Sequence, residues 1–394
     1  MLTFRSAGES HGSAIFGLIE GLPAGLSIDV AAVDLELERR QAGFGRGARM
    51  KIERDRLSIR AGVVHGKTSG APLLFEIANR DTALSAMAPL HRPRPGHADL
   101  AGALKYLTDD ARPVLERASA RETCARVAAG AIVGQLLERF GVKTFSFVDA
   151  IGGIAADVDP SAPIARLRRA RGRSDLACPD AAASRRMRAE IVDAARAGDS
   201  VGGTFVVVAD GVPPGLGSCG QWDERLDGLL ARAIVSIPAI KGVEIGLGFE
   251  AARRRGAAVH DEIFWAGRTG RFGGVVRGSD RAGGLEGGIT NGERLVVRAA
   301  MKPISTLRRP LRSIDLRRRS AASAAFERAD VCAVPAASVV GEAMVRLTLG
   351  SAFVSKFGGD SLTEIEANFA SWRAEVRRRF APRERSGRTA RSHR

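Results

Sequence analysis

The sequence predicts an α+β fold, and three observations lead to this class. Helical and strand-like patterns follow one another along the 394 residues without the regular strand–helix–strand rhythm of a parallel sheet. No segment recurs at the fixed periods that mark solenoids or propellers. No linker rich in proline and serine divides the chain, and 45% of its residues are apolar, enough for a sizeable core. We therefore expect one large domain over residues 1–375 and a basic, disordered tail over residues 376–394.

The first half of the chain contains two predicted helices and one irregular loop. Residues 34–40 are expected to form a short helix, because leucines stand among charged residues there. A loop rich in glycine and arginine follows over residues 43–49. Ser119-Ala-Arg-Glu122 has the spacing of a capping box, in which the two side chains satisfy the first free N–H groups of a helix. This box opens a helix that we expect to run to about Phe140.

The second half alternates strands and helices. The β-branched run within residues 203–212 predicts a buried strand, and residues 294–301 alternate as a second strand does. Residues 226–235 and the apolar stretch 338–349 are predicted helices. A second capping box, residues 361–364, opens a helix that leads into the basic tail.

The formal charge of +16 is compatible with two kinds of partner. Fifty-three of the 60 basic residues are arginine, and nine arginines against two glutamates lie between Arg373 and the end. Such a surplus fits either nucleic acid or small anionic substrates. The sequence has no helix-turn-helix pattern, and its single tyrosine argues against an aromatic surface on which nucleic-acid bases stack. We expect no nucleic-acid partner and keep nucleic-acid binding as a distant alternative.

Cysteine usage and hydropathy indicate a cytoplasmic protein. The four cysteines are scattered without a C-x-x-C pair, which fits a reducing compartment. The first residues, Met-Leu-Thr-Phe-Arg-Ser, show no secretory signal, and no uninterrupted apolar run is long enough to span a bilayer. We expect no membrane association.

Several familiar catalytic patterns are absent or misplaced. Residues 8–12 satisfy G-x-S-x-G, but only seven residues precede them, too few for the strands that a nucleophile elbow requires. The glycine-rich segments match neither a dinucleotide fingerprint nor a P-loop. The six histidines show no i, i+4 spacing, so we predict no metal site.

Six segments combine small residues, arginine and a titratable group. Small residues beside Ser10 and His11 let the backbone approach a ligand closely. Arginines suit phosphate and carboxylate groups, and His97 can transfer a proton near neutral pH. A hydroxyl at a helix N-terminus, as at Ser119, favours anions. The six segments are residues 7–12, 39–49, 92–99, 117–123, 283–292 with 302–306, and 328–332.

Together these segments resemble the chorismate synthase family. Gly-Glu-Ser-His-Gly at residues 8–12 and Arg-Pro-Gly-His-Ala-Asp at residues 94–99 are signatures of that family. Ala239-Ile-Lys-Gly-Val-Glu-Ile-Gly246 and Val334-Pro-Ala-Ala337 match it as well. The matches follow the family's order from about Thr3 to about Leu362, some nine tenths of the chain.

The resemblance implies an FMN-dependent lyase. The implied reaction is an anti-1,4-elimination of phosphate from 5-enolpyruvylshikimate-3-phosphate, which gives chorismate with loss of a proton from C6. It uses reduced FMN without net redox change. NADPH is the possible ultimate reductant, and an external flavin reductase is the expected partner because no reductase segment is apparent. The implied fold is a sandwich with helices between antiparallel sheets, and the implied assembly is a homotetramer.

The resemblance also assigns roles by position. His11 corresponds to the histidine that protonates the reduced flavin, and His97 to the one that gives a proton to the departing phosphate. Asp330, with Ser10, corresponds to the pair that removes the C6 proton. The implied FMN-binding residues are Arg117, Ala118, Ser119, Pro238, Ala239, Gly287, Lys302, Pro303, Ile304, Ser305, Thr306 and Arg328. Arg40, Arg46 and Arg49 correspond to substrate- or NADP-binding residues.

One departure from the family keeps an alternative open. Residues 82–91 are shorter than the segment that the family usually carries there, and they lack its tryptophan. Loops beside active sites often act as lids, so this change bears on substrate closure. A paralogue of the same fold, with an altered substrate or no activity, is therefore the second hypothesis.

Overall fold

Two antiparallel sheets form the framework of the molecule. The computed structural model describes residues 2–47, 52–265, 272–327 and 330–380. The first sheet has the strand order β1 (Thr3–Ala7), β2 (Ala14–Glu20), β6 (Leu73–Ala78) and β3 (Ser58–Ala61). Its register places Ile15 opposite Ile77, so that their side chains enter the core together.

The second sheet has five strands, which are also antiparallel. Strand β9 (Gly203–Asp210) lies at its centre, between β7 (Lys143–Ile151) and β15 (Leu295–Met301). The outer strands are β10 (Ile240–Ile245) and the short β8 (Ile154–Ala155). The centre of β9 is buried on both faces, which explains its continuous β-branched run.

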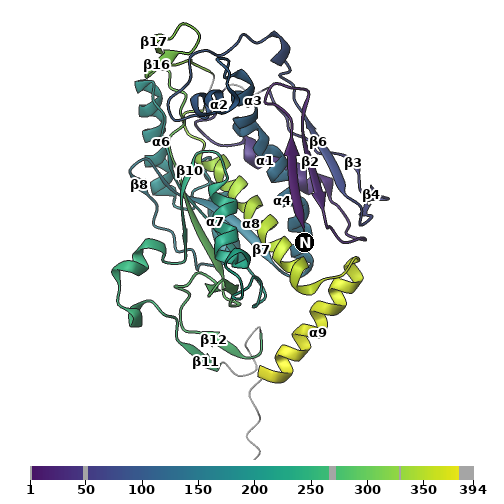
Figure 1. Ribbon diagram of the computed structural model, residues 1–394. Coiled ribbons are helices and arrows are strands. Elements are labelled where there is room, and N and C mark those ends of the chain that lie inside the picture. Colours follow the sequence, from purple (N-terminus) through teal and green to yellow (C-terminus); the bar gives the residue numbers. More distant parts are fainter. Residues whose placement is uncertain (1, 48–51, 266–271, 328–329, 381–394) are drawn as a thin grey trace, which may run out of the picture.

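Helices fill the space between the two sheets. Helix α4 (Thr123–Arg139) packs against β2 and β6 of the first sheet, and α8 (Val334–Phe357) packs against β7 and β9 of the second. These two helices also pack on each other (Figure 1), and their backbones come close together at Gly130, where an added Cβ would lie 2.5 Å from Ala343 Cα. The prediction of an α+β fold is thus confirmed.

The remaining elements surround this framework. Helix α1 (Val30–Gln41) packs on α4 and α8, and α7 (Leu226–Val235) packs on α8. The others are β4 (Val63–Val64), β5 (Lys67–Thr68), η2 (Leu84–Ala86), α2 (Asp99–Tyr106), α3 (Arg112–Ala118), η3 (Ala120–Glu122), α5 (Ile164–Arg171), α6 (Ala181–Ala197), η4 (Trp222–Glu224), η5 (Gly248–Arg253), η6 (Gly256–Ala258), β11 (Ile263–Trp265), β12 (Val275–Arg277), β13 (Leu285–Glu286), β14 (Ile289–Thr290), β16 (Arg312–Asp315), β17 (Ser320–Ser323) and α9 (Leu362–Phe380).

Helix α8 is the longest of the described helices, and most of its residues are buried. It is long and apolar enough to cross a bilayer by composition, but 78% of its most apolar window is buried inside the protein. Its one buried acid, Glu342, accepts hydrogen bonds from Thr144 and Ser146 of β7 and pairs with Arg39 and Arg346. Burial and pairing make this helix part of the core.

The predicted boundaries differ from the observed ones at helix ends. Helix α1 begins at Val30 rather than residue 34, because the Asp29 side chain caps it by accepting from Ala32 N at 3.0 Å. Helix α8 extends beyond 338–349 at both ends. Helix α9 continues through Phe380, so it includes the first five residues of the segment that we assigned to the tail.

The two capping boxes have different outcomes. At residues 361–364 the Glu364 carboxylate accepts from Ser361 N at 2.8 Å while Ser361 Oγ accepts from Glu364 N at 3.3 Å, as predicted. At residues 119–122 the prediction of a capping box is wrong. Ser119 instead caps the single turn η3, and the Glu122 carboxylate pairs with Arg126 at 2.9 Å.

Candidate active site

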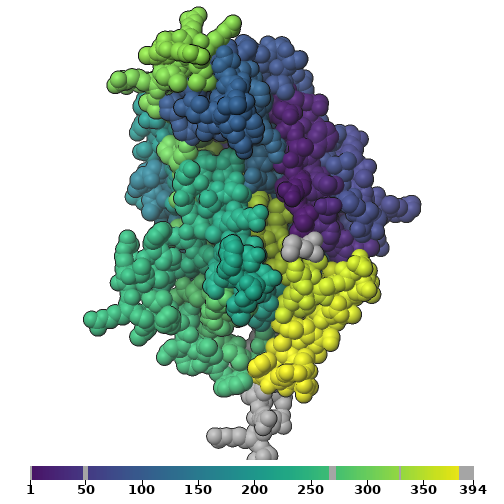
Figure 2. Space-filling view, in the orientation of Figure 1, coloured from purple at the N-terminus to yellow at the C-terminus, as the bar shows by residue number. Residues whose placement is uncertain are grey.

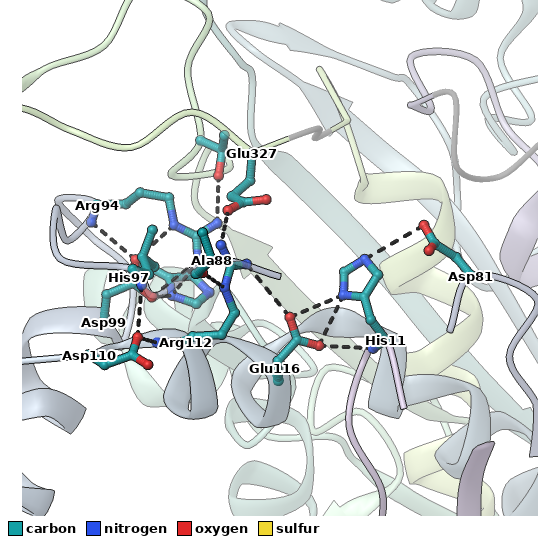
Figure 3. A network of polar contacts seen from close by, with 12 residues as sticks. His11, Asp81, Ala88, Arg94, His97, Asp99, Asp110, Arg112, Glu116 and Glu327 are labelled. Carbon is teal, nitrogen blue, oxygen red and sulfur yellow. Dashed lines mark hydrogen bonds and ion pairs between the residues drawn. The ribbon is translucent and has the colours of Figure 1, made fainter. Parts of the chain in front are cut away.

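His11 is held by a carboxylate from a distant part of the chain. It lies in the turn between β1 and β2, and its Nδ1 is 3.0 and 3.1 Å from the two carboxylate oxygens of Glu116 in α3. The His11 backbone N–H also donates to Glu116, at 2.8 Å. On the other side of the ring, Nε2 is 3.8 Å from Asp81 (Figure 3).

The Glu116 carboxylate is ionised in this setting. Its side chain is fully buried, which raises its pKa, but the hydrogen bonds from His11 and the charge of Arg112 more than offset this, and the net pKa is lowered. An ionised carboxylate only accepts hydrogen bonds, so the proton of a neutral His11 ring lies on Nδ1. The Nε2 atom is then the nitrogen available for exchange.

His97 has the same kind of anchor. Its Nδ1 contacts the carboxylate of Asp99, the first residue of α2. Asp99 is fully buried and accepts from Arg94 through the backbone N (3.1 Å), Nε (2.8 Å) and NH2 (3.1 Å). Burial raises the pKa of Asp99, but the hydrogen bonds from His97 and Arg94 outweigh it and lower the pKa well below its usual range.

The protonated nitrogen of His97 follows from this charge. Arg94 NH2 lies 3.0 Å from His97 Nδ1 and could donate to it only if that nitrogen carried no proton. An Nδ1 without a proton would turn its lone pair toward the ionised Asp99 carboxylate that it contacts, so Nδ1–H is the favoured arrangement. We therefore assign the proton to Nδ1, with Arg94 bonded to Asp99, which leaves Nε2 as the nitrogen that can exchange a proton.

The anchoring residues were not recognised in the sequence. Glu116 and Arg112 are 105 and 101 positions from His11, and no local pattern links them to it. Asp99 and Arg94 stand inside the signature around His97 and could have been proposed, because a carboxylate two residues from a histidine is a common orienting partner.

Arg112 connects the His11 anchor to two loops. Its NH1 is 3.8 Å from Glu116, its NH2 donates to Glu327 at 3.0 Å, and its Nε donates to the carbonyl of Ala88 at 3.2 Å. Ala88 belongs to the shortened segment 82–91. Figure 3 shows Arg112 between these partners, so one guanidinium holds together both loops beside His11.

The segment 302–306 lies against the loop that carries His97. Lys302 Nζ donates to the carbonyl of Gly96, and Thr306 Oγ1 accepts from Arg94 at 2.9 Å. Burial and the charge of Lys241 lower the pKa of Lys302. Figure 2 shows that the neighbouring surfaces of α2–α3 (blue) and β16–β17 (bright green) adjoin at one end of the molecule. The contacts of Lys302 and Thr306 thus bring the segment 302–306 against the loop of His97.

The predicted positions 117–119 lie close to Ser10 and His11. The Arg117 guanidinium donates to the carbonyls of Gly8 (3.1 Å) and Ser6 (3.0 Å) at the end of β1. The backbone N–H of Ser10, a buried residue, donates to the carbonyl of Glu116 at 3.1 Å. Ala118 and Ser119 are the next residues and are half-buried.

Asp330 pairs with the arginine-rich loop. Its carboxylate accepts from Gly47 N at 2.6 Å and lies 3.0 Å from Arg46 NH1. Burial lowers the pKa of Arg46. The negative charge of Asp330 raises this pKa and the positive charge of Arg40 lowers it further, so the net pKa is lowered. The structure thus brings Asp330 and Arg46 together. Arg49 and Arg328 lie outside the described residues.

Arg40 is buried in an ion-pair network of its own. Its NH2 donates to Asp55 at 2.6 Å and its NH1 to Thr123 at 3.3 Å, and only 3% of the residue is exposed. Arg121 contacts the same Asp55 carboxylate. Burial raises the pKa of Asp55, but the two arginines more than offset it and lower that pKa.

Gly287 and the pair Pro238–Ala239 lie at opposite ends of α7. Gly287 stands in the exposed turn between β13 and β14, and the next residue, Gly288, accepts from Leu226 N at the start of α7 at 2.9 Å. Pro238 and Ala239 follow the end of that helix, and Ala239 accepts from Lys302 N at 3.0 Å. A ten-residue helix is roughly 15 Å long, so one ligand would have to span about that length to touch both.

The described residues contain no metal-binding cluster. No group of three or more His, Cys, Asp or Glu side chains in this part of the chain could hold a metal ion. The groups that the described residues bring to the site are two oriented histidines, a carboxylate and several arginines.

Comparisons with known proteins identify relatives along nearly the whole chain. The family model described as chorismate synthase matches residues 2–354. A chorismate synthase of Desulforudis audaxviator is 52% identical over 389 residues, covering 96% of this chain and 98% of the relative. One from Symbiobacterium thermophilum is 50% identical over 395 residues, covering 96% of this chain and all of the relative. A crystal structure of chorismate synthase is similar with a TM-score of 0.79 and 41% identity, over 96% of this chain and 98% of that one.

Proposed function

The chain belongs to the chorismate synthase family, and from this premise we propose that His11 and His97 are its proton-transfer residues. The enzyme is a lyase that eliminates phosphate from 5-enolpyruvylshikimate-3-phosphate to give chorismate, in aromatic amino acid biosynthesis. The observation that supports the proposal is their shared anchoring. Each Nδ1 contacts a fully buried carboxylate, so that proton exchange takes place at Nε2, which at His11 lies 3.8 Å from Asp81.

His97 is assigned to the departing phosphate. It lies beside Arg94 and on the loop that Lys302 contacts, so the surroundings are cationic. A phosphate that leaves its carbon gains charge, and these cations lower the cost of that charge. Proton delivery from Nε2 of His97 completes the departure and contributes roughly 10² to 10⁴-fold to the rate.

The proton on C6 requires a base elsewhere in the site. We assign this role to Asp330 acting with Ser10, and His11 holds a second proton at Nε2 near the cofactor. Arg46 and Gly47 orient the Asp330 carboxylate, because Arg46 NH1 lies 3.0 Å from it and Gly47 N donates to it at 2.6 Å.

The family is flavin-dependent, and we propose that the cofactor is reduced FMN. When bound, it supplies electron density that eases cleavage of the C–O bond without net redox change. Lys302 fits the phosphate of FMN. Burial and the charge of Lys241 lower the pKa of Lys302, and its ammonium group donates to a neutral carbonyl, that of Gly96. A nearby anion would therefore stabilise the charged form of this lysine. The residues proposed to hold FMN are Arg117, Ala118, Ser119, Pro238, Ala239, Gly287, Lys302, Pro303, Ile304, Ser305, Thr306 and Arg328.

The arginines of the 40–49 region are proposed to bind the substrate's anionic groups or NADP. Arg46 lies beside Asp330, and Arg40 stands behind it with its guanidinium on Asp55. The charges of Arg40 and Arg46 repel each other, so a bound anion would stabilise both. Arg49 completes the set as proposed from the sequence.

The wider setting is also a proposal. The packing of α4 and α8 between the two sheets supports the family's sandwich architecture. We propose a cytoplasmic homotetramer that receives reduced flavin from an external reductase, with NADPH as the possible ultimate reductant.

A paralogue with an altered substrate is the second candidate, because the segment 82–91 is short. This segment is nevertheless anchored: Leu84 N donates to the His11 carbonyl at 3.2 Å, and Leu90 N donates to Asp110 at 2.8 Å. The anchoring supports the first hypothesis. Flavin binding without turnover would favour the paralogue.

The test compares His97→Ala with His91→Ala. His91 is a half-buried histidine in the same region whose Nδ1 bonds only the carbonyl of Asp109 among the described residues. We expect His97→Ala to lower kcat about 10² to 10⁴-fold with unchanged FMN affinity, and His91→Ala to stay near wild type. Near-normal turnover of His97→Ala would remove it from the mechanism.

A further inference from the structure

We propose that Glu116 is a positioning residue that fixes the orientation and tautomer of His11; this rests on the proton-transfer role proposed for His11. The Glu116 side chain is fully buried behind the His11 ring, so it does not contact the reacting atoms itself. It acts on the reaction through His11.

The first argument is the number of bonds that Glu116 makes to the turn after β1. Its carboxylate receives both the ring Nδ1 and the backbone N–H of His11, at 3.0 and 2.8 Å. Its own carbonyl receives the backbone N–H of Ser10 at 3.1 Å. Two successive residues of the turn are thus bonded to one residue of α3, which leaves the imidazole little freedom to rotate.

The second argument is the charge that Arg112 provides. A buried carboxylate without a cation would favour its neutral form, which could donate to Nδ1 and reverse the tautomer. Arg112 lies one helical turn before Glu116 on α3, with NH1 3.8 Å from the carboxylate, and it is itself fixed by Glu327 and the Ala88 carbonyl. This arrangement keeps Glu116 an acceptor.

The third argument is that the same design occurs twice. His97 also has its Nδ1 on a fully buried carboxylate, Asp99, and that carboxylate is also paired with an arginine, Arg94. In both cases the buried carboxylate engages Nδ1 and not Nε2, and at His11 Nε2 lies 3.8 Å from Asp81. Two unrelated segments that converge on one arrangement indicate that the tautomer matters for both histidines.

The test is a double-mutant cycle on the FMN-loaded enzyme with Glu116→Gln and His11→Ala. A glutamine amide can turn its NH2 toward Nδ1 and drive the proton to Nε2. We expect Glu116→Gln to lower kcat about 10- to 100-fold with FMN affinity and KM within about twofold. In the His11→Ala background the same change should have no further effect, because its influence passes through His11. Glu122→Gln is the matched control: Glu122 is a buried carboxylate nearby that pairs with Arg126, and its loss should leave kcat near wild type.

A structural measurement tests the positioning role of Glu116 separately from the proton-transfer role of His11. Nitrogen NMR of ¹⁵N-histidine-labelled holoenzyme should find the His11 proton on Nδ1 in the wild type and a shift toward Nε2 in Glu116→Gln. An Nε2–H tautomer in the wild type overturns the inference even if the variant fails to fold. Slow turnover in His11→Ala with normal turnover in Glu116→Gln overturns the positioning role alone. Normal turnover in His11→Ala overturns the proton-transfer role on which it rests.

Discussion

Replacing Asp99 by asparagine should abolish most of the turnover while the fold remains. The Asp99 carboxylate accepts three hydrogen bonds from Arg94 and contacts His97 Nδ1. An amide has one acceptor oxygen and one NH2 group, so it cannot satisfy both partners. If the oxygen faces Arg94, the NH2 faces Nδ1, so His97 loses the anionic partner that stabilises the imidazolium from which Nε2 delivers a proton.

The magnitude follows from the loss of one oriented acid. General acid catalysis contributes roughly 10² to 10⁴-fold, so kcat should fall by about that factor, or about 3 to 5 kcal/mol in activation free energy. The assay is anaerobic turnover with reduced FMN, together with FMN affinity, which should change little. Asp109→Asn, at an exposed aspartate shortly after the end of α2, is the control and should behave as wild type. A kcat for Asp99→Asn within about threefold of wild type would refute the assignment of the His97 tautomer.

Further predictions concern stability and substrate binding. Glu342→Gln should lower the free energy of unfolding, measured in urea, by about 3 kcal/mol, because it breaks the buried ion pairs with Arg39 and Arg346. Both arginines would still be paired with Glu36. A loss below about 1 kcal/mol would contradict this prediction. The folded-state pKa of Glu342 is lowered, so its contribution is present at neutral pH and should be lost as the pH falls below 4.5, which unfolding at stepped pH would measure. Gly130→Ala should lower the free energy of unfolding by about 1 to 3 kcal/mol, because α4 and α8 must move apart to admit the new Cβ. Gly228→Ala should raise it by up to about 1 kcal/mol, because the new Cβ meets no atoms within 4 Å and alanine favours the helix. Thermal melts that rank the two variants in the opposite order would be inconsistent with this packing. Arg46→Ala should chiefly raise KM, and unchanged KM and kcat would remove it from substrate binding.

The elements that the sequence predicts best are those with strong local signals. Helix α7 begins and ends at the predicted residues, since its apolar residues recur at helical spacing. The box at residues 361–364 forms, and its Glu364 carboxylate accepts from the backbone N–H groups of both Asp360 and Ser361. The box at residues 119–122 fails because Arg126, one turn later, takes the Glu122 carboxylate. Tertiary contacts thus override the local pattern where a charged neighbour is available.

The site is predictable only in part for a similar reason. Ser10, His11 and His97 stand in dense local motifs, and the resemblance to a known family assigns them roles. Glu116 is a single acid within a helix, and its partnership with His11 exists only after α3 packs against the turn that follows β1. The burial of Arg40 is equally invisible in the sequence, since an arginine in a charged helix is usually solvated. Contacts over a hundred positions come from the fold, not from local spacing.

The most direct test of the function is an anaerobic assay of the purified protein with chemically reduced FMN and 5-enolpyruvylshikimate-3-phosphate. Chorismate is followed by its absorbance and phosphate by a parallel assay. We predict that the two products appear in equal amounts and that neither forms when the FMN is left oxidised. Flavin binding without any release of chorismate or phosphate would contradict the proposed activity and point to a changed substrate.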